Sequence, residues 1–188
     1  IQAMDKVKFK TMQDGDKEDY DLLNTYEEKF AKDLPDRILN FLKTLDGSLD
    51  GYQITRLEHS LQTATRATKD GANEEMVVAA LMHDIGDGLA TFNHSQFAAS
   101  VLRPYVSEKI YWIIKHHGLF QTYYYNHHLG KDRNVRETYK DSPYYQDTIN
   151  FCEKWDQVSF DPNYENYTLE YFEPMVRRVF SKAINNLG

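Results

Sequence analysis

The segment AALMHDIGD, residues 79–87, places two adjacent polar residues, His83 and Asp84, at the end of an otherwise apolar stretch. Residues three, four and seven apart share one face of an α-helix, so both residues continue faces that point into a core. A buried imidazole or carboxylate is costly unless another group compensates it. A bound metal ion is the simplest compensation, and the pair therefore predicts a helical fold around a polar centre.

The hydrophobic pattern predicts helices along the whole chain and shows no strand-like alternation. Proline suits the first turn of a helix, so Pro35 marks a helix start, whereas Pro174 is expected to kink or delay the last helix. The polar and aromatic stretch 118–143 has weak periodicity and resembles a loop or a lid. We predict an all-α fold, one helical bundle over residues 1–188, with helices at 17–32, from Asp33 to Asp46-Gly47, and at 54–69, 73–84, 94–103, 107–117, 144–158 and 168–184.

Composition limits the classes of partner. The 22 Lys and Arg residues against 29 Asp and Glu residues give a net charge of -7, and no basic run is present, which argues against nucleic acid or an anionic membrane. The longest apolar run, 76–82, is far too short to span a membrane. Cys152 is the single cysteine and no secretory signal is visible, so we expect a cytoplasmic chain without an internal disulfide. Residues 1–3 precede Met4 and are expected to be a remnant of expression.

Three further polar residues lie on predicted helical faces that are otherwise apolar. His94 precedes apolar residues on its face, His117 ends an isoleucine stripe, and Asp156 shares a face with Cys152. His59 is the exception, because it lies well around its helix from the apolar residues. Either that helix is buried on two sides, or His59 is simply solvated.

Other histidines compete for the same roles. His116 shares a face with Trp112, but the isoleucine stripe favours His117 as the ligand. His127 and His128 lie in the polar stretch and are expected to contact substrate at most. A lone core histidine is more often hydrogen-bonded than metal-bound, but several converging imidazoles and carboxylates are hard to explain in that way. Such a set suits iron, manganese or zinc, and a carboxylate can bridge two metals.

The ordered set of histidines and aspartates resembles the signature of the HD-domain superfamily of metal-dependent enzymes, in which two additional histidines mark the dinuclear members. By this resemblance Asp84 bridges two metals, and His94 and His117 bind the second one. The metal ligands implied by the resemblance are therefore His59, His83, Asp84, His94, His117 and Asp156.

A longer segment, LEHSLQTATRATKDGANEEMVVAALMHDIGD at residues 57–87, is similar to the HD-domain diiron oxygenases of the PhnZ type. Those enzymes cleave hydroxylated aminophosphonates and are relatives of myo-inositol oxygenase. The similarity resumes at Leu102-Arg103, Ser107-Glu108 and His117 and touches roughly residues 50–160. It implies two iron ions as cofactors, with manganese, cobalt or other divalent metals as the alternative.

Three positions depart from the oxygenase pattern. Asp87 stands where those enzymes have a basic residue, Gln121 where they have a lysine, and Tyr52 where a glutamate would fall. Asp87 suits a cationic or hydroxylated substrate better than a phosphonate. Glu58 flanks His59 and is placed to orient it or a bound water. We therefore name Asp87, Gln121 and Glu58 as candidate catalytic residues. The cations that would have to replace the missing ones are Lys115, Lys131, Arg133 and Arg136, each of which is ordinarily a solvated charge.

Three functions are compatible with these residues. The leading hypothesis is a mixed-valent diiron oxygenase that uses dioxygen to cleave a small hydroxylated substrate. The alternative is a metal-dependent phosphohydrolase acting on a nucleotide or another phosphate ester. The third is a metal-stabilised binding module that uses the tyrosine-rich segment 119–128 as its surface. The expected partners of an enzyme are a small-molecule substrate and dioxygen, and the sequence leaves the oligomeric state open.

Overall fold

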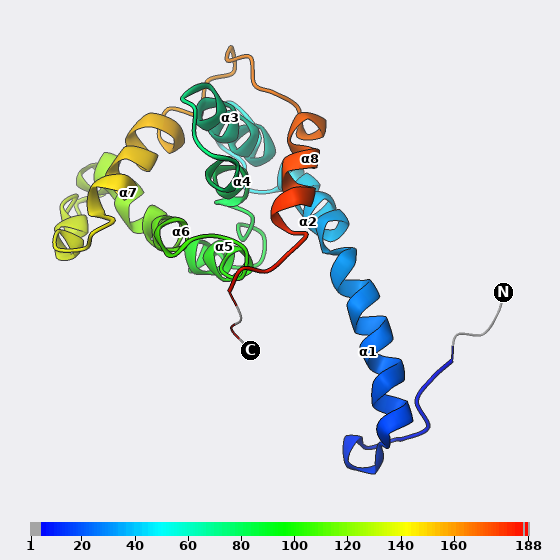
Figure 1. Cartoon of the computed structure of the whole chain (residues 1–188). Coiled ribbons are helices and arrows are strands. Elements are labelled where there is room, and N and C mark those ends of the chain that lie inside the picture. Colours follow the sequence, from blue (N-terminus) through cyan, green and yellow to red (C-terminus); the bar gives the residue numbers. More distant parts are fainter. Residues whose placement is uncertain (1–4, 186, 188) are drawn as a thin grey trace.

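A computed structural model describes residues 5–185 and residue 187, and these residues form helices and connecting turns with no β-strand among them. Figure 1 shows the resulting helical bundle, which confirms the predicted all-α class. The prediction for residues 1–3 lies outside the described residues. None of the described helices combines the length and the apolar composition needed to cross a bilayer.

The observed helices follow most of the predicted ranges. The first helix begins and ends as expected, and the others differ by a few residues at their ends. The α-helices are α1 (Lys17–Lys32), α2 (Leu34–Lys43), α3 (Arg56–Lys69), α4 (Glu74–Met82), α5 (His94–Leu102), α6 (Glu108–Gln121), α7 (Tyr145–Phe151) and α8 (Leu169–Val179).

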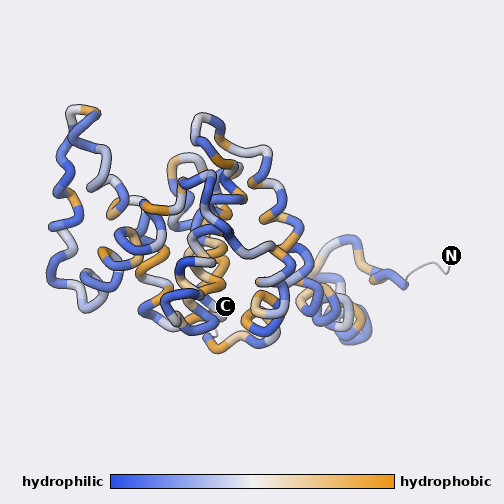
Figure 2. The backbone as a smooth tube through the Cα atoms, turned by 90° about the horizontal axis from the view of Figure 1, so that it is seen from above, coloured by the Kyte–Doolittle hydropathy of each residue, from blue (hydrophilic) through white to orange (hydrophobic). Residues whose placement is uncertain are grey.

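Two helices, α3 and α4, lie at the centre of the bundle, with α2 and α8 on one side and α5 and α6 on the other (Figure 1). Small side chains such as Ala64 and Ala80 are fully buried and let these central helices approach closely. The hydrophobic stretches of the chain gather in this interior, as Figure 2 shows. Because α3 is enclosed on most of its faces, most of its polar residues, His59 among them, are buried too.

Side-chain caps fix where the central helices begin. Thr55 accepts a hydrogen bond from the backbone N–H of Glu58, whose carboxylate accepts one from the N–H of Thr55, so α3 starts with a capping box. Asn73 caps α4 and Ser107 caps α6 through their side-chain oxygens. These caps fix the residue at which each of the three helices begins.

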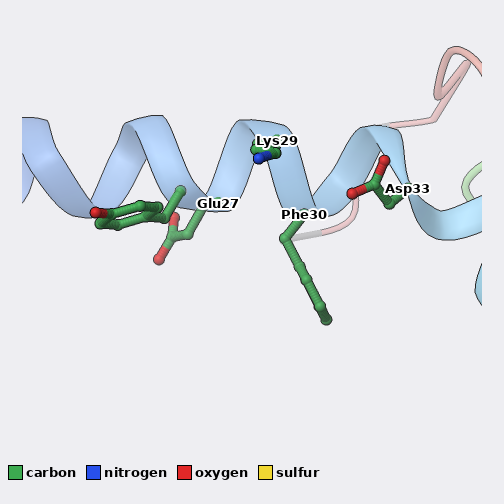
Figure 3. Close-up of a pocket in the computed structure, with 5 residues that line it drawn as sticks. Glu27, Lys29, Phe30 and Asp33 are labelled. Atoms are coloured by element: carbon green, nitrogen blue, oxygen red, sulfur yellow. The ribbon is translucent and has the colours of Figure 1, made fainter. Parts of the chain in front are cut away.

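The first helix, α1, projects from the bundle (Figure 1), and it packs against α2 and against the N-terminal segment, where Phe9 stacks on Tyr20. Its stripe of Tyr20, Tyr26 and Phe30 remains partly or largely exposed. The groove beside this stripe has a volume of about 450 Å³, and the close-up in Figure 3 shows Phe30 pointing away from the helix. No histidine lines the groove, so it does not compete with the polar centre as a catalytic site.

Three segments differ from their predictions. The helix predicted over 73–84 ends at Met82, because the N–H groups of Ile85 and Asp87 bond to carbonyls three residues back and tighten the chain into a turn. The sixth helix continues through Gly118 to Gln121. The remainder of the stretch 118–143 is not an irregular loop but contains the 3-10 helices Thr122–Tyr124, Asn126–Leu129 and Val135–Tyr139.

The C-terminal helices also differ. The helix predicted over 144–158 is divided into α7 and a π-helix, Cys152–Asp156. The last helix ends at Val179 rather than near residue 184, and Pro174 lies inside it. Pro174 is the sixth residue of α8, so its missing N–H removes the ladder bond that would go to the carbonyl of Glu170, yet the helix continues past it to Val179.

Candidate metal centre

Five of the six predicted metal ligands converge in the interior of the bundle, and all five are buried. His59 comes from α3, His83 and Asp84 from the turn after α4, His117 from α6, and Asp156 from the π-helix. Their nitrogen and oxygen atoms form overlapping groups in which all atoms lie within 4.8 Å of one another. Distant parts of the chain therefore contribute to one polar centre.

Backbone carbonyls fix the orientation of three imidazoles. The Nδ1 atom of His59 lies 2.8 Å from the carbonyl oxygen of Ser159, and those of His83 and His117 lie 2.6 Å from carbonyls of their own segments. A carbonyl only accepts, so each Nδ1 carries the proton and donates it. Each Nε2 then presents a lone pair to the centre, which is the arrangement a metal-binding imidazole requires.

The Asp84 carboxylate lies between two sets of histidines. Its Oδ2 atom is 3.3 Å from His59 Nε2 and 3.1 Å from His83 Nε2. Its Oδ1 atom is 3.2 Å from His117 Nε2 and 3.5 Å from His94 Nε2. We call His59, His83 and Asp156 the inner half of the centre, and His94 and His117 the outer half, with Asp84 shared by both.

The centre suits cations because imidazole nitrogens and carboxylate oxygens direct their lone pairs toward one another. The Nε2 atoms of His59 and His83 face each other at 3.0 Å, although both rings already carry their proton on Nδ1. Asp156 Oδ1 approaches the same two nitrogens at 3.2 Å and 3.4 Å. Lone pairs at these separations repel unless a positive charge lies among them. The donor set, imidazole with carboxylate, fits iron, manganese or zinc.

The pKa values of His83 and Asp84 are shifted in the directions that favour positive charge in the centre. Burial alone would lower the pKa of His83, but the carboxylates of Asp84 and Asp156 raise that pKa well above its ordinary value. Burial would raise the pKa of Asp84, but the neighbouring imidazoles hold it well below its usual range. Both carboxylates are therefore ionised over the physiological pH range and available as ligands.

The π-helix explains how Asp156 reaches the centre. The N–H of Gln157 bonds to the carbonyl of Cys152, five residues back, so this turn holds one residue more than an α-helical turn. The thiol of Cys152 donates to the carbonyl of His117 and joins the π-helix to α6. The π-helix, and not the predicted α-helical turn, therefore sets the direction of the Asp156 side chain.

His94 differs from the other predicted ligands. It is the first residue of α5, and 32% of its side chain is exposed. Its ring lies against His117, with ring centroids 5.2 Å apart. A Cβ atom on Gly118 would lie 3.3 Å from the ring of His94 and 2.5 Å from Ser95 Oγ, so only glycine lets α6 approach α5 this closely.

Two questions that the sequence left open have structural answers. His59 is buried because α3 is enclosed on more than one side. His117 faces the centre, whereas His116 stacks on Trp112 with ring centroids 3.8 Å apart and points away. His127 and His128 lie in the 3-10 helix Asn126–Leu129, where both are exposed and contact each other.

The three candidate catalytic residues have different surroundings. Asp87 Oδ2 accepts a hydrogen bond from Arg56 Nε at 2.7 Å, so its charge is already paired. Gln121 lines the cavity at the centre, and its buried Oε1 has no hydrogen-bond partner among the described residues. Glu58 does not reach the centre, because its side chain is exposed and its carboxylate closes the capping box of α3.

A cavity of about 260 Å³ opens onto the polar centre. Tyr52 stacks on Phe160 at 4.9 Å between ring centroids, and Phe160 stacks on His59 at 4.3 Å, so these rings form one wall. Tyr124 and Tyr125, from the segment predicted as a lid, form another part of the lining. Burial raises the pKa of Tyr124 from 10.0 to about 12.

Arg56, like Phe160, lines this cavity and was not predicted from the sequence. Its Nη2 donates to Asp84 Oδ2 and its Nε donates to Asp87 Oδ2. A spacing of three before His59 places it on the same side of α3, which was the available signal. The other cations do not line the cavity: Arg133 and Arg136 lie over the ring of Tyr123, and Lys115 and Lys131 are solvent-exposed.

Comparison with known proteins identifies one family. A model of the HD domain matches residues 56–149, which include every predicted ligand except Asp156. A [1-hydroxy-2-(trimethylamino)ethyl]phosphonate dioxygenase (glycine-betaine-forming) from Leisingera caerulea is 33% identical over 78 residues. The alignment covers 36% of this chain and 40% of the relative, so the chain matches less than half of that protein's length.

Proposed function

The chain belongs to the HD-domain family of metal-dependent enzymes, and on that premise we propose that it is a dinuclear iron oxygenase that cleaves a small hydroxylated substrate. In this proposal the inner half and Asp84 bind one metal ion. The outer half and Asp84 bind the other. The metal pair, when bound, supplies the oxidising chemistry with dioxygen, and the protein supplies position and charge.

The observation that carries the dinuclear proposal is the direction of the two oxygens of Asp84. One oxygen lies near the nitrogens of His59 and His83, and the other lies near those of His94 and His117. A carboxylate placed in this way suits a bridge between two ions. A mononuclear centre would leave the outer imidazoles without a ligand role.

The oxygenase chemistry is supported by the relative, whose name describes a dioxygenase acting on a hydroxylated compound. The alignment is partial, so the reaction and substrate are proposed for this chain and not transferred to it. The cavity of about 260 Å³ is at the small end of ligand sites, which favours a small substrate. Tyr124, Tyr125 and Gln121 would hydrogen-bond its polar groups.

Charge in the cavity narrows the substrate further. Among the described residues that line the cavity, Arg56 is the one arginine, and no lysine is present. The carboxylates of Asp84 and Asp87 already neutralise its charge. An anionic group at the far end of the substrate would therefore find no free cation there. Neutral polyols therefore suit this lining better than a phosphonate does.

Oxygen uptake tests the proposal. Iron-loaded, partly reduced protein is mixed with [1-hydroxy-2-(trimethylamino)ethyl]phosphonate and with a panel of small polyols and amino alcohols. We expect dioxygen consumption in proportion to product with at least one compound, and an axial electron paramagnetic resonance signal of mixed-valent iron. Asp84→Ala serves as the matched metal-site control and should show neither.

The alternative activity gives a different result in the same preparation. A phosphohydrolase would release phosphate from a nucleotide panel with manganese or cobalt and would need no oxygen. Phosphate release without dioxygen uptake, together with the absence of the mixed-valent signal, would overturn the oxygenase proposal and favour hydrolysis.

A further inference from the structure

Arg56 joins the shared carboxylate of the centre to a second carboxylate outside it. Its side chain is only 9% exposed, and its guanidinium donates from Nη2 to Asp84 Oδ2 and from Nε to Asp87 Oδ2. The guanidinium also lies 5.1 Å from the ring centroid of Tyr52, which belongs to the stacked wall of the cavity. Arg56 is thus held by an ion pair on one side and an aromatic ring on another.

The contact matters because the terminal torsion of an aspartate is soft. Rotation about the bond to the carboxyl group exchanges or displaces the two oxygens at little cost. When Nη2 of Arg56 holds Oδ2 toward the inner half, Oδ1 must point toward His94 and His117. Among the described residues, Arg56 is the one Lys or Arg side chain that pairs with Asp84. If that contact is lost, no second cationic side chain of these residues fixes the rotation of the Asp84 carboxylate.

We propose that Arg56 is a positioning residue that fixes the Asp84 carboxylate for the outer metal ion, and that Asp87 in turn fixes Arg56. The inference rests on the proposed dinuclear function. The inner ion keeps His59, His83 and Asp156 whatever the rotation of Asp84. The outer ion has the two imidazoles and one oxygen of Asp84, so its binding depends on the rotation.

Charge and position predict opposite effects, which makes the inference testable. Removal of a guanidinium beside two cations relieves repulsion, so charge alone predicts tighter metal binding in Arg56→Met. Loss of positioning predicts weaker binding of the second ion by about 10- to 100-fold, the range typical of outer-shell partners of metal ligands. Arg56→Lys keeps the charge and loses the planar fork, so charge alone predicts no change.

The experiment titrates metal-free protein with Mn²⁺ by isothermal calorimetry, and free Mn²⁺ is counted by electron paramagnetic resonance. We expect the wild type to bind two ions, and Arg56→Met and Arg56→Lys to bind the first ion as before and the second at least about tenfold more weakly. Asp87→Asn should weaken the second ion selectively as well. Far-UV circular dichroism of each metal-free variant checks the fold.

Arg177 offers a matched control, because it also lies between two carboxylates, Asp36 and Glu173, but on the surface. Arg177→Met should bind both ions as the wild type does. If Arg56→Met does not fold, Arg56→Lys decides the question, because the Asp87 carboxylate itself lies within 4.8 Å of donor atoms of Asp84 and His94. Second-ion affinity that is unchanged or higher in the folded Arg56 variants would overturn the inference while leaving the dinuclear proposal intact. A wild-type chain that binds fewer than two ions would overturn both.

Discussion

The two halves of the polar centre differ in how firmly the fold holds them. In the inner half, His59 and His83 are fully buried and both rings are fixed by backbone carbonyls. In the outer half, His117 is fixed in the same way, but His94 begins its helix, is partly exposed, and has no carbonyl partner for its ring among the described residues. The inner half is therefore preorganised and the outer half is adjustable.

The inner half is the part suited to tight binding, and the outer half is the part accessible from the cavity. A preorganised set loses little conformational entropy when it binds an ion, so the inner half should bind first and most tightly. The outer half borders the cavity through His94, Gly118 and Gln121, so an ion there would be reached by substrate and would exchange more readily.

The largest effects on metal content and turnover should come from two single variants, each of which removes one imidazole from one half of the centre. His59→Ala should lose the tight ion and, with it, all activity. His94→Ala should keep one ion per chain and lose at least about 100-fold in turnover. Metal analysis of the purified variants measures both, and an equal loss of metal in the two variants would contradict the asymmetry.

Metal removal should lower the thermal stability of the chain. An ion that binds only the folded state stabilises it by about 2.7 kcal/mol when its concentration is a hundredfold above Kd. For a chain of this size that corresponds to a fall in Tm of about 5–10 °C after chelation. Differential scanning calorimetry with and without chelator measures the shift, and readdition of one equivalent of Mn²⁺ should restore most of it. A Tm that does not respond to chelation would argue against a structural contribution from the inner ion.

A smaller change should affect the outer half alone. Gly118→Ala places a Cβ atom 2.5 Å from Ser95 Oγ and 3.3 Å from the ring of His94. We expect α5 to shift and the second ion to bind about tenfold more weakly, with the first ion unaffected. Gly47→Ala is a suitable control, since nothing lies within 4 Å of its added Cβ. Unchanged binding of both ions would show that the close approach is not needed.

The smallest effect concerns the cavity wall. Burial raises the pKa of Tyr124 from 10.0 to about 12, so the native state keeps a proton that the unfolded chain releases. The contribution of this group to stability is therefore complete below pH 10 and declines as the pH rises toward 12. The ultraviolet difference between wild type and Tyr124→Phe during alkaline titration reports this phenol. An ordinary tyrosine titration would contradict the burial of Tyr124.

Much of the fold could be predicted from the sequence because helical periodicity is local. The ranges of α1 and α2 and the stripe ending in His117 follow from spacing and from proline and glycine positions. Tertiary context determined what spacing could not. The burial of His59 depends on helices packed on both sides of α3, and the turn that carries His83 and Asp84 begins two residues earlier than the periodic pattern suggests.

The candidate site was less predictable than the fold. Asp87 is predicted to face substrate, but its partner Arg56 lies in α3, distant in sequence, and pairs with its charge. Glu58 was expected near His59 because of its neighbouring position, but a capping box turned its side chain to solvent. Ion pairs between distant segments and the extra residue of the π-helix have no counterpart in a one-dimensional pattern.

The central claim is that the polar centre binds two metal ions in unequal halves. Anaerobic titration of the metal-free chain with Fe²⁺, followed by calorimetry and by metal analysis of the recovered protein, tests it most directly. We predict two ions per chain in two resolved steps, the first tighter than the second. A single ion per chain, or two ions bound with equal affinity, would contradict this account.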